Sequence, residues 1–322
     1  MSGGANRVGP GVERRIRIRA LREAAPYLKR FRGKTFVIKA GGAALATPAA
    51  IRDLVEQVAL LFRLGVRVVL VHGGGPQSTA LAHALGIPAR FVQGRRVTDA
   101  GALRVSTMVL NGEINTRILA GCRDLELPAI GLSGVDAGLI RAHRRPPVEV
   151  REGARSETVD YGFVGDIDGV ESGVLERQLE IGMVPVVSPL SADAAGNLLN
   201  INADTVAAAL AVALGAEKMI LSGGNPGGLL ADPDDPDSLI SFLDLAGLNE
   251  LREAGVVRTG MLPKADCITS ALEGGVARAH LVSAEVPDSL LLEVFTLEGS
   301  GTLVVRDLDD LSGAERQLRS GA

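Results

Sequence analysis

Three polar residues that could bind a ligand or take part in catalysis lie together in Asn200-Ile-Asn202-Ala-Asp204. They come directly before an apolar run that is typical of a helix. Two amides and a carboxylate at a helix start suit a polar, anionic small molecule, because the free N–H groups and the helix dipole favour negative charge. The carboxylate could position a cation. The alternative is that Asn200 or Asn202 only caps the helix. Because capping needs one such residue and the chain has three, we favour a site.

Two glycine clusters follow predicted strands. Lys39-Ala-Gly-Gly42 begins with the last residue of the predicted strand 35–39. His72-Gly-Gly-Gly75 directly follows the apolar run 66–71. In open α/β sheets ligands bind at the carboxyl ends of strands, and glycines there let backbone N–H groups approach an anion. Neither cluster is a Walker loop or a dinucleotide fingerprint. Tight turns also use glycine, but two clusters with a lysine at one strand end favour a phosphate or carboxylate site.

Two further cations belong to candidate site motifs. Gly260-Met-Leu-Pro-Lys264 begins a predicted helix, and a lysine near the positive end of a helix is unfavourable unless an anion lies close. Lys264 therefore predicts a nearby phosphate; the alternative is a lysine that reaches into solvent. Arg96, within Gly94-Arg-Arg-Val-Thr-Asp99, could hold a substrate carboxylate in a bidentate fork, whereas an exposed arginine is otherwise a surface charge.

Two lysines, one aspartate and several backbone N–H groups suit phosphoryl transfer, in which catalysis is mostly positioning and charge neutralisation. A carboxylate acceptor is already ionised at neutral pH, since its reference pKa is about 4. Such a reaction needs no general base, so the lack of a histidine or cysteine catalyst is no objection to it.

Strand and helix patterns alternate from residue 34 onward, which predicts a mostly parallel sheet covered by helices on both faces, a three-layer αβα sandwich. The stretch 139–170 differs and predicts antiparallel strands, and 223–240 is a Gly/Pro/Asp-rich loop. A helix over 12–31 precedes the body, and Pro26 is expected to break or kink it. The predicted strands are 35–39, 66–71, 128–132, 184–188, 218–222, 278–282 and 301–305, and the later helices are 49–64, 76–85, 103–119, 205–214, 245–254 and 265–272.

The composition is that of an ordinary globular protein of one large or two moderate domains, with 322 residues, 46% apolar and 22% charged. A net charge of −4 gives no case for nucleic acid. Cys122 and Cys267 indicate neither a disulfide framework nor a metal site, and the four histidines lack ligand spacing. With no membrane-length apolar run and no signal-peptide pattern, we expect a cytoplasmic protein.

Taken in order, these motifs resemble the amino-acid kinase family, and the match runs from about Lys34 to Val305. Each motif alone is modest, but the ordered set is specific to the family and to its members that act on N-acetyl-L-glutamate. The motifs are Val37-Ile-Lys-Ala-Gly-Gly42, Val71-His-Gly-Gly-Gly75, Gly94-Arg-Arg-Val-Thr-Asp99, Gly131-Leu-Ser-Gly-Val-Asp136, Asn200-Ile-Asn-Ala-Asp204, Gly260-Met-Leu-Pro-Lys264 and Leu291-Leu-Glu-Val-Phe-Thr296.

The resemblance implies ATP-dependent phosphorylation of the side-chain carboxylate of N-acetyl-L-glutamate in arginine biosynthesis. By this resemblance Lys39 and Lys264 stabilise the transferring phosphoryl group, and Asp204 orients the two lysines. Mg²⁺ is carried on the nucleotide phosphates, and no protein metal site is expected. The other implied residues are Gly41 and Gly42 for phosphate, Gly74, Gly75, Arg96, Asn200 and Asn202 for the acyl substrate, and Ser222, Gly223, Gly224 and Met261 for the nucleotide.

Residues 1–12 are Gly-rich and are expected to be disordered, so 1–33 is predicted to hold a disordered start and the N-terminal helix. The resemblance also implies an acyl-substrate and dimerisation lobe at 34–190, a nucleotide lobe at 191–322, and a homodimer or a hexamer. Four departures stand out: Ser222-Gly-Gly-Asn-Pro-Gly-Gly228 lacks the usual acid, and Thr259, Ala43 and Asp288 replace a glycine, an Asn or Ser, and the histidine of arginine-inhibited members. The alternatives are a sister kinase for another acylated or carrier-linked acidic amino acid, or a catalytically silent regulator.

Overall fold

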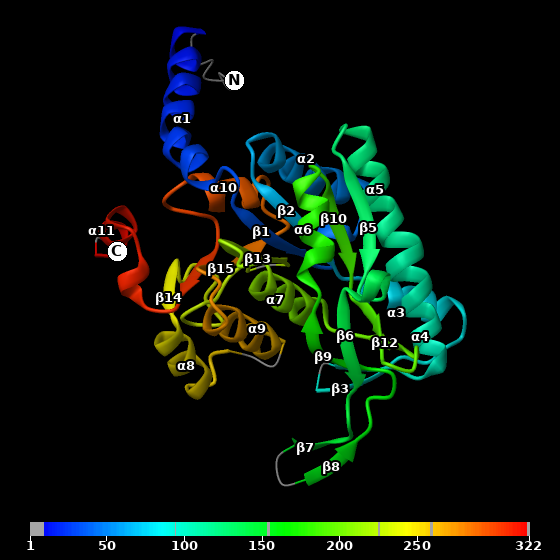
Figure 1. Ribbon diagram of the computed structural model, residues 1–322. Coiled ribbons are helices and arrows are strands. Elements are labelled where there is room, and N and C mark those ends of the chain that lie inside the picture. Colours follow the sequence, from blue (N-terminus) through cyan, green and yellow to red (C-terminus); the bar gives the residue numbers. More distant parts are fainter. Residues whose placement is uncertain (1–9, 94, 153–154, 225, 258–259, 321–322) are drawn as a thin grey trace, which may run out of the picture.

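A single eight-stranded sheet forms the centre of the computed structural model, which describes residues 10–320 except 94, 153–154, 225 and 258–259 (Figure 1). All neighbouring strands pair in parallel except β15 and β16. The predicted mostly parallel sheet is therefore confirmed. Across the sheet the order is β14 (Phe242–Asp244), β16 (Thr302–Val305), β15 (Arg278–Ser283), β13 (Lys218–Gly223), β1 (Thr35–Ala40), β2 (Arg67–His72), β10 (Val184–Ser188) and β5 (Ala129–Ser133).

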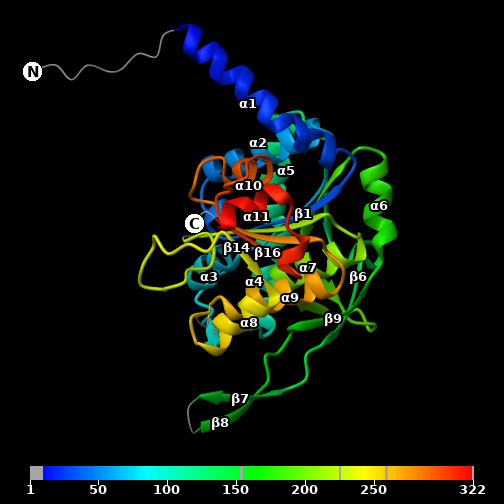
Figure 2. The same cartoon turned by 90° about the vertical axis from the view of Figure 1, so that its left-hand side faces the viewer.

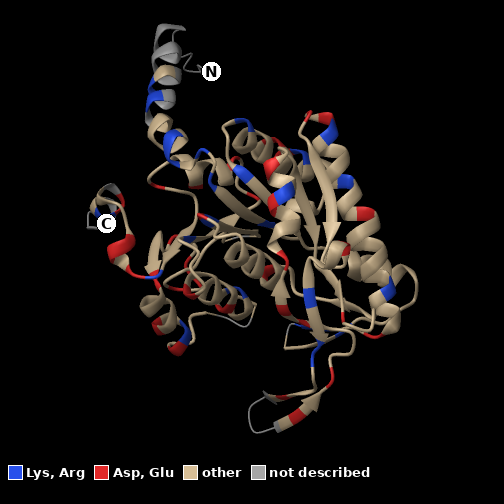
Figure 3. Cartoon of the chain, viewed as in Figure 1, with Lys and Arg blue, Asp and Glu red and all other residues tan. Residues whose placement is uncertain are grey.

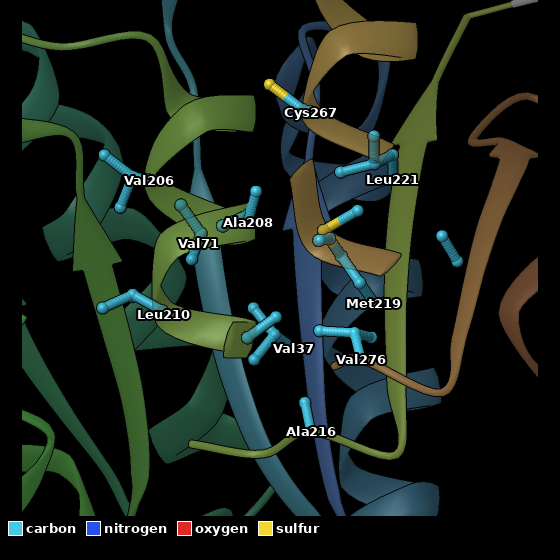
Figure 4. Packing of buried hydrophobic residues seen from close by; sticks show 14 of the residues in the cluster. Val37, Val71, Val206, Ala208, Leu210, Ala216, Met219, Leu221, Cys267 and Val276 are labelled. Carbon is cyan, nitrogen blue, oxygen red and sulfur yellow. The ribbon is translucent and has the colours of Figure 1, made fainter. Parts of the chain in front are cut away.

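Helices cover both faces of this sheet because the strands carry apolar residues on both sides. In β1, Val37 belongs to one buried cluster while Phe36 and Ile38 belong to the other. Figure 4 shows the first cluster, in which α7 and α9 pack on β1, β2 and β13. The three-layer αβα architecture is confirmed. One face holds α6 (Ser172–Glu180), α7 (Ala203–Ala213), α8 (Leu245–Glu253) and α9 (Leu262–Glu273), and the other holds α2 (Pro48–Arg63), α3 (Gly75–Ala84), α4 (Ala100–Thr107), α5 (Asn115–Asp124) and α10 (Ser289–Phe295).

A smaller sheet and two hairpins lie at one end of the molecule. The antiparallel strands predicted within 139–170 are confirmed, and the hairpin of β7 and β8 projects from the body in both views (Figures 1 and 2). The small sheet has the order β12 (Leu198–Asn200), β11 (Leu190–Ala192), β6 (Ile140–Arg144) and β9 (Gly165–Val170), and the hairpins are β3 (Arg90–Val92) with β4 (Arg95–Val97) and β7 (Val148–Glu152) with β8 (Arg155–Val159).

The first helix, α1 (Pro10–Phe31), runs past Pro26 to Phe31, so of the break or kink predicted at Pro26 the break is wrong. An internal proline costs about 3 kcal/mol. Packing after Pro26 offsets this cost: Phe31 is buried and its ring centroid lies 5.2 Å from that of Phe36 in the sheet. The disordered start predicted for residues 1–12 falls largely on residues 1–9, which lie outside the described residues.

The helix predicted over 103–119 is interrupted. It consists of α4, a π-helical turn at Met108–Ile114, and α5. The sequence pattern also missed α6, α10 and a C-terminal helix, α11 (Gly313–Ser320). The loop predicted over 223–240 starts at the end of β13, and its described residues carry an isolated bridge between Leu230 and Leu239. A π-turn adds one residue to a helical turn, so the apolar spacing on which the prediction depends changes phase there.

Charged residues of both signs are interspersed over the visible helices (Figure 3). Both cysteines are free and buried. In the part of the chain that the structure describes, no helix combines the length and apolar character needed to cross a bilayer.

A buried polar chain connects β13 and β15 to the segment before β16. Lys218 Nζ lies 2.9 Å from His280 Nε2, and His280 Nδ1 lies 2.6 Å from a carboxylate oxygen of Glu293. The second oxygen of Glu293 accepts from the backbone N–H groups of Ser300 and Gly301. The donors and acceptors match when the imidazole is neutral, and burial lowers the pKa of His280 to about 4.

This chain makes the stability of the protein depend on pH. Burial lowers the pKa of Lys218 to about 7, below its ordinary 10.5. Between these values the unfolded chain holds a proton that the folded state releases, so this residue makes folding more favourable as the pH rises from 7 to 10. We expect Lys218→Met to remove a rise of about 3–4 kcal/mol in the free energy of unfolding between pH 7 and pH 10, since one pKa unit is about 1.4 kcal/mol.

The measurement is urea unfolding of both proteins at pH 7 and pH 10. Lys34→Met is the matched control, because the Lys34 side chain is 54% exposed. A stability difference between wild type and Lys218→Met that is the same at both pH values would contradict the assignment.

Candidate active site

Three charged side chains from distant parts of the sequence meet at the carboxyl end of the central strands. Lys39 is the penultimate residue of β1, Asp204 lies in the first turn of α7, and Lys264 lies in the first turn of α9. Lys39 Nζ is 2.8 Å from Oδ1 of Asp204, and Lys264 Nζ is 3.0 Å from Oδ2. The predicted convergence is present, and the anion beside Lys264 at its helix start is Asp204 itself.

Burial and charge act against each other in this cluster. Burial disfavours the charged form of Asp204, but the ammonium groups of Lys39 and Lys264 outweigh it and hold the pKa of Asp204 below its ordinary value. Burial lowers the pKa of Lys39, and the charge of Lys264 lowers it further, while Asp204 raises it. Two lysines and one aspartate leave an excess of one positive charge, which suits an anionic reactant.

Each glycine cluster contains a position at which a side chain would collide with its surroundings. Gly41 donates its N–H to Ser222 O at 2.8 Å, and a Cβ on Gly41 would lie 2.7 Å from that oxygen. A Cβ on Gly74 would lie 2.5 Å from Ile114 Cδ1 and 2.7 Å from Leu110 Cδ2. These close approaches explain why Gly41 and Gly74 are glycines. The backbone of both residues lines the cleft described next.

An open cleft of about 640 Å³ lies over these groups. Its walls include the N-terminal ends of α3, α7 and α9, whose free N–H groups and dipoles favour negative charge. This volume falls within the range of about 300–1,000 Å³ that is typical of small-molecule sites. The predicted site residues that line it are Lys39, Gly41, Gly42, Gly74, Gly75, Arg96, Asn200, Asn202 and Asp204.

The other predicted residues lie around this cleft and not in its described lining. Lys264 donates to the carboxylate of Asp204, which lines the cleft, and the carbonyl of Ser222 accepts from the N–H of Gly41, which also lines it. Gly223 and Gly224 continue from Ser222 at the end of β13, and Met261 packs partly against the hydrophobic core. Asp288 is an exposed residue before α10 with φ +56°. Thr259 and Asn225 lie outside the described residues.

Arg96 and Asn200 also line the cleft. The Arg96 guanidinium donates to Gly75 O at 3.3 Å and to the hydroxyl of Thr79, and it lies 4.7 Å from the centroid of the Phe91 ring. Asn200 Nδ2 lies 3.4 Å from Thr98 Oγ1. The cleft therefore offers a further cation and an amide to a second polar group of a ligand.

Asn202 serves as the helix cap, because its side-chain oxygen accepts from the backbone N–H groups of Asp204 and Thr205. The capping alternative thus holds for Asn202, while Asp204 and Asn200 are free of that role. Sequence reasoning missed several residues that line the cleft. Thr79 and Asp266 lie in α3 and α9, whereas Phe91, Arg145 and Tyr161 come from a hairpin and from irregular segments, and the only signal for any of them was the arginine pair at 144–145.

The family model for the amino acid kinase family matches residues 34–283, which include Lys39, Asp204 and Lys264. The chain belongs to the amino acid kinase family. The acetylglutamate kinase of Myxococcus xanthus is 51% identical to this amino acid kinase over 89% of this chain and 94% of its own length. That of Symbiobacterium thermophilum is 45% identical over 89% and 96%, respectively.

Solved structures agree with the fold of this amino acid kinase. The N-acetylglutamate synthase of Neisseria gonorrhoeae, complexed with coenzyme A and N-acetyl-glutamate, aligns with a TM-score of 0.77 and 28% identity over 90% of this chain, which spans 63% of that chain. The carbamate kinase of Giardia lamblia bound to AMP-PNP aligns with a TM-score of 0.59 at 16% identity, over 85% of this chain and 99% of that one, and supports the fold alone.

Proposed function

We propose that this amino acid kinase transfers the terminal phosphoryl group of ATP to the side-chain carboxylate of N-acetyl-L-glutamate, giving the acyl phosphate for arginine biosynthesis in the cytoplasm. The single observation that carries the proposal is the cluster of Lys39 and Lys264 on Asp204 at the floor of the cleft. The identity to acetylglutamate kinases over nearly their full length supports the choice of acceptor.

In the proposed reaction Lys39 and Lys264 neutralise the oxygens of the phosphoryl group as it moves between two anionic reactants. Asp204 holds both ammonium groups in place before the reactants bind. The acceptor carboxylate attacks directly, because it is already ionised. The backbone N–H of Gly42 faces the phosphates and those of Gly74 and Gly75 face the acceptor. Because the N–H of Gly41 is bonded to Ser222 O, Gly41 contributes only the close approach of its backbone, and not the N–H donation to phosphate expected from the sequence.

The proposed role of Mg²⁺ is to neutralise the nucleotide phosphates on which it is carried. The two carboxylates in the described lining of the cleft are both paired with cations, Asp204 with the lysines and Asp266 with Arg252 at 2.6 Å. Such a donor set fits an ion held by the nucleotide better than one held by the protein. Nucleotide contacts are proposed for Ser222, Gly223, Gly224 and Met261.

The sheet takes β1, β2, β5 and β10 from the segment 34–190 and its other four strands from 191–322. We propose that the first segment binds the acyl substrate and forms the dimer interface, and that the second binds the nucleotide. A homodimer or a trimer of dimers is the proposed assembly.

The direct test is release of ADP and trapping of the acyl phosphate as a hydroxamate, with purified protein, ATP, Mg²⁺ and each of several acceptors. We expect N-acetyl-L-glutamate to give the highest kcat/KM, above L-glutamate, N-acetyl-L-aspartate and N-acetyl-L-α-aminoadipate. A higher kcat/KM with another acceptor would indicate that the protein is a sister kinase for that acceptor. Binding of both ligands without any ADP release would indicate a silent family member.

Arg96 gives a prediction for the acyl end of the cleft. Replacing it by alanine is expected to raise the KM for N-acetyl-L-glutamate about 10–100-fold, because a hydrogen bond to a charged group contributes about 1.5–3 kcal/mol. The KM for ATP should change less than threefold. Arg90→Ala is the matched control, since Arg90 lies on the same hairpin with a 63% exposed side chain. Equal effects of both substitutions would refute a specific role for Arg96.

A further inference from the structure

A buried histidine stands directly behind the glycine turn of the cleft. His72 is the last residue of β2 and has no exposed surface, and Gly73, Gly74 and Gly75 follow it into the cleft wall. Its Nδ1 lies 3.0 Å from Gly73 O and its Nε2 lies 3.1 Å from Asn115 Nδ2. The proposed mechanism gives this histidine no role.

The hydrogen bonds of Asn115 determine where the imidazole carries its proton. Asn115 Nδ2 also donates to Val186 O at 3.0 Å, so the nitrogen, and not the oxygen, of this amide faces both partners. Because an amide nitrogen only donates, His72 Nε2 must accept. The proton therefore resides on Nδ1, which donates it to Gly73 O. Burial lowers the pKa of His72 to about 4, so the ring is neutral at physiological pH.

This hydrogen bond fixes the direction of the next peptide group. In a trans peptide the C=O of one residue and the N–H of the following residue point in opposite directions. When His72 holds the carbonyl of Gly73, the N–H of Gly74 points away from His72. Gly74 has no side chain to restrain its own backbone, and its φ of 173° is extended. The histidine thus supplies a restraint that the glycines cannot supply.

The π-turn provides the partner for this histidine. Asn115 follows the π-turn Met108–Ile114 directly, and two residues of that turn, Leu110 and Ile114, contact the Gly74 position from the other side. Asn111 in the same turn hydrogen-bonds Ser188 at the end of β10. One residue more or less in a helix rotates all later residues by about 100° around its axis, so a regular helix would turn Asn115 away from His72 and Val186.

We propose that His72 and Asn115 form a positioning pair, brought into register by the π-turn, that aims the Gly74 N–H at the acceptor carboxylate. The pair acts through the glycine turn and touches no substrate itself. Only the identity of the group that meets this N–H rests on the proposed function; the proton position and the restraint of Gly73 do not.

Two amide substitutions separate the two hydrogen bonds of the histidine. The side-chain nitrogen of Asn can occupy the place of Nδ1, so His72→Asn keeps a donor for Gly73 O and loses the acceptor for Asn115. The longer Gln reaches the place of Nε2, so His72→Gln keeps the acceptor and loses the donor. Both variants place a neutral amide at the same buried position, so their effects on stability are matched and are measured by thermal unfolding.

We expect His72→Gln to lower kcat/KM for the best acceptor of the substrate panel by about 10–100-fold, the effect of one hydrogen bond to a charged group. The KM for ATP should change less than threefold, and His72→Asn, which keeps the donor for Gly73 O but loses the bond to Asn115, should lose less kcat/KM than His72→Gln. A loss that is equal in the two variants, or a change in thermal stability alone, would overturn the proposal.

Nitrogen-15 NMR of the histidine rings tests the pair without any substrate. We expect the His72 signal, assigned by its loss in His72→Asn, to show a protonated Nδ1 and an unprotonated Nε2 at pH 7. The opposite tautomer would overturn the proposal. If N-acetyl-L-glutamate is not the acceptor, the proposed function fails in the panel, while this spectrum still decides whether the pair exists.

Discussion

Replacing Lys39 by methionine is expected to lower kcat by about 10³-fold, because the loss of one preorganised donor at a developing charge typically costs about 10²–10³ and Lys39 also carries a full charge. The side chain is only 10% exposed, so bulk water cannot replace the ammonium group. Methionine keeps an unbranched apolar chain of similar length, so the wall of the cleft stays filled. The KM values should change far less than kcat, since the missing charge acts mainly in the transition state.

The measurement is steady-state ADP release with saturating ATP and acceptor, together with circular dichroism to check the fold. Lys34→Met, five residues earlier and exposed, is the matched control and should retain full activity. A Lys39→Met enzyme with near-normal kcat would show that the cluster on Asp204 is not the phosphoryl-transfer centre.

Replacing Asp204 by asparagine is expected to affect rate, pH dependence and stability together. Both of its oxygens face ammonium groups, at 2.8 Å for Lys39 and 3.0 Å for Lys264. An amide of the same shape leaves two buried cations without their anion. Breaking a buried ion pair from one side costs about 3–5 kcal/mol, and we expect a loss of that order in the free energy of unfolding at pH 7.

The pH dependence of this loss has a definite sign. The folded state holds the pKa of Asp204 below its ordinary 3.8, so its contribution to stability is complete above that value and disappears as the pH falls through the folded-state pKa. The stability difference between wild type and Asp204→Asn should therefore shrink in acid. A difference that persists unchanged well below pH 3.8 would mean that the charge of Asp204 is not what stabilises the fold.

The same substitution should shift the alkaline limit of activity. Asp204 is the group that raises the pKa of Lys39 against the effects of burial and of Lys264. Without the carboxylate, Lys39 loses its proton at a lower pH, so we expect the alkaline limb of the kcat profile to move to lower pH and kcat itself to fall about 10²–10³-fold. An unchanged alkaline limb in Asp204→Asn would exclude Lys39 as the group that sets it.

Many elements of the fold could be predicted from local patterns. The apolar strands 35–39 and 218–222 and the helix 205–214 are close to β1, β13 and α7, because burial on both faces requires apolar strands and a helix start has its own polar signals. The break expected at Pro26 was wrong, since the proline rule describes an isolated helix and α1 is held by the burial of Phe31 further along.

The candidate site could be predicted only in part. The motif at 200–204 and the two lysines were recognisable by residue type, and their meeting at Asp204 matches the prediction. The wall that holds Phe91, Arg145 and Tyr161 was not predictable, because these residues come from hairpins and irregular segments whose placement depends on other parts of the chain.

Composition and periodicity are local properties, so they were enough to identify the charged residues and glycines at the ends of strands and to offer Asn202 as a helix cap. The contacts of Asp204 with both lysines, and of Asn115 with His72 after the π-turn, emerged only from the folded chain. These contacts join residues far apart in the sequence. Their geometry depends on the packing of several elements at once, and no single stretch of sequence encodes it.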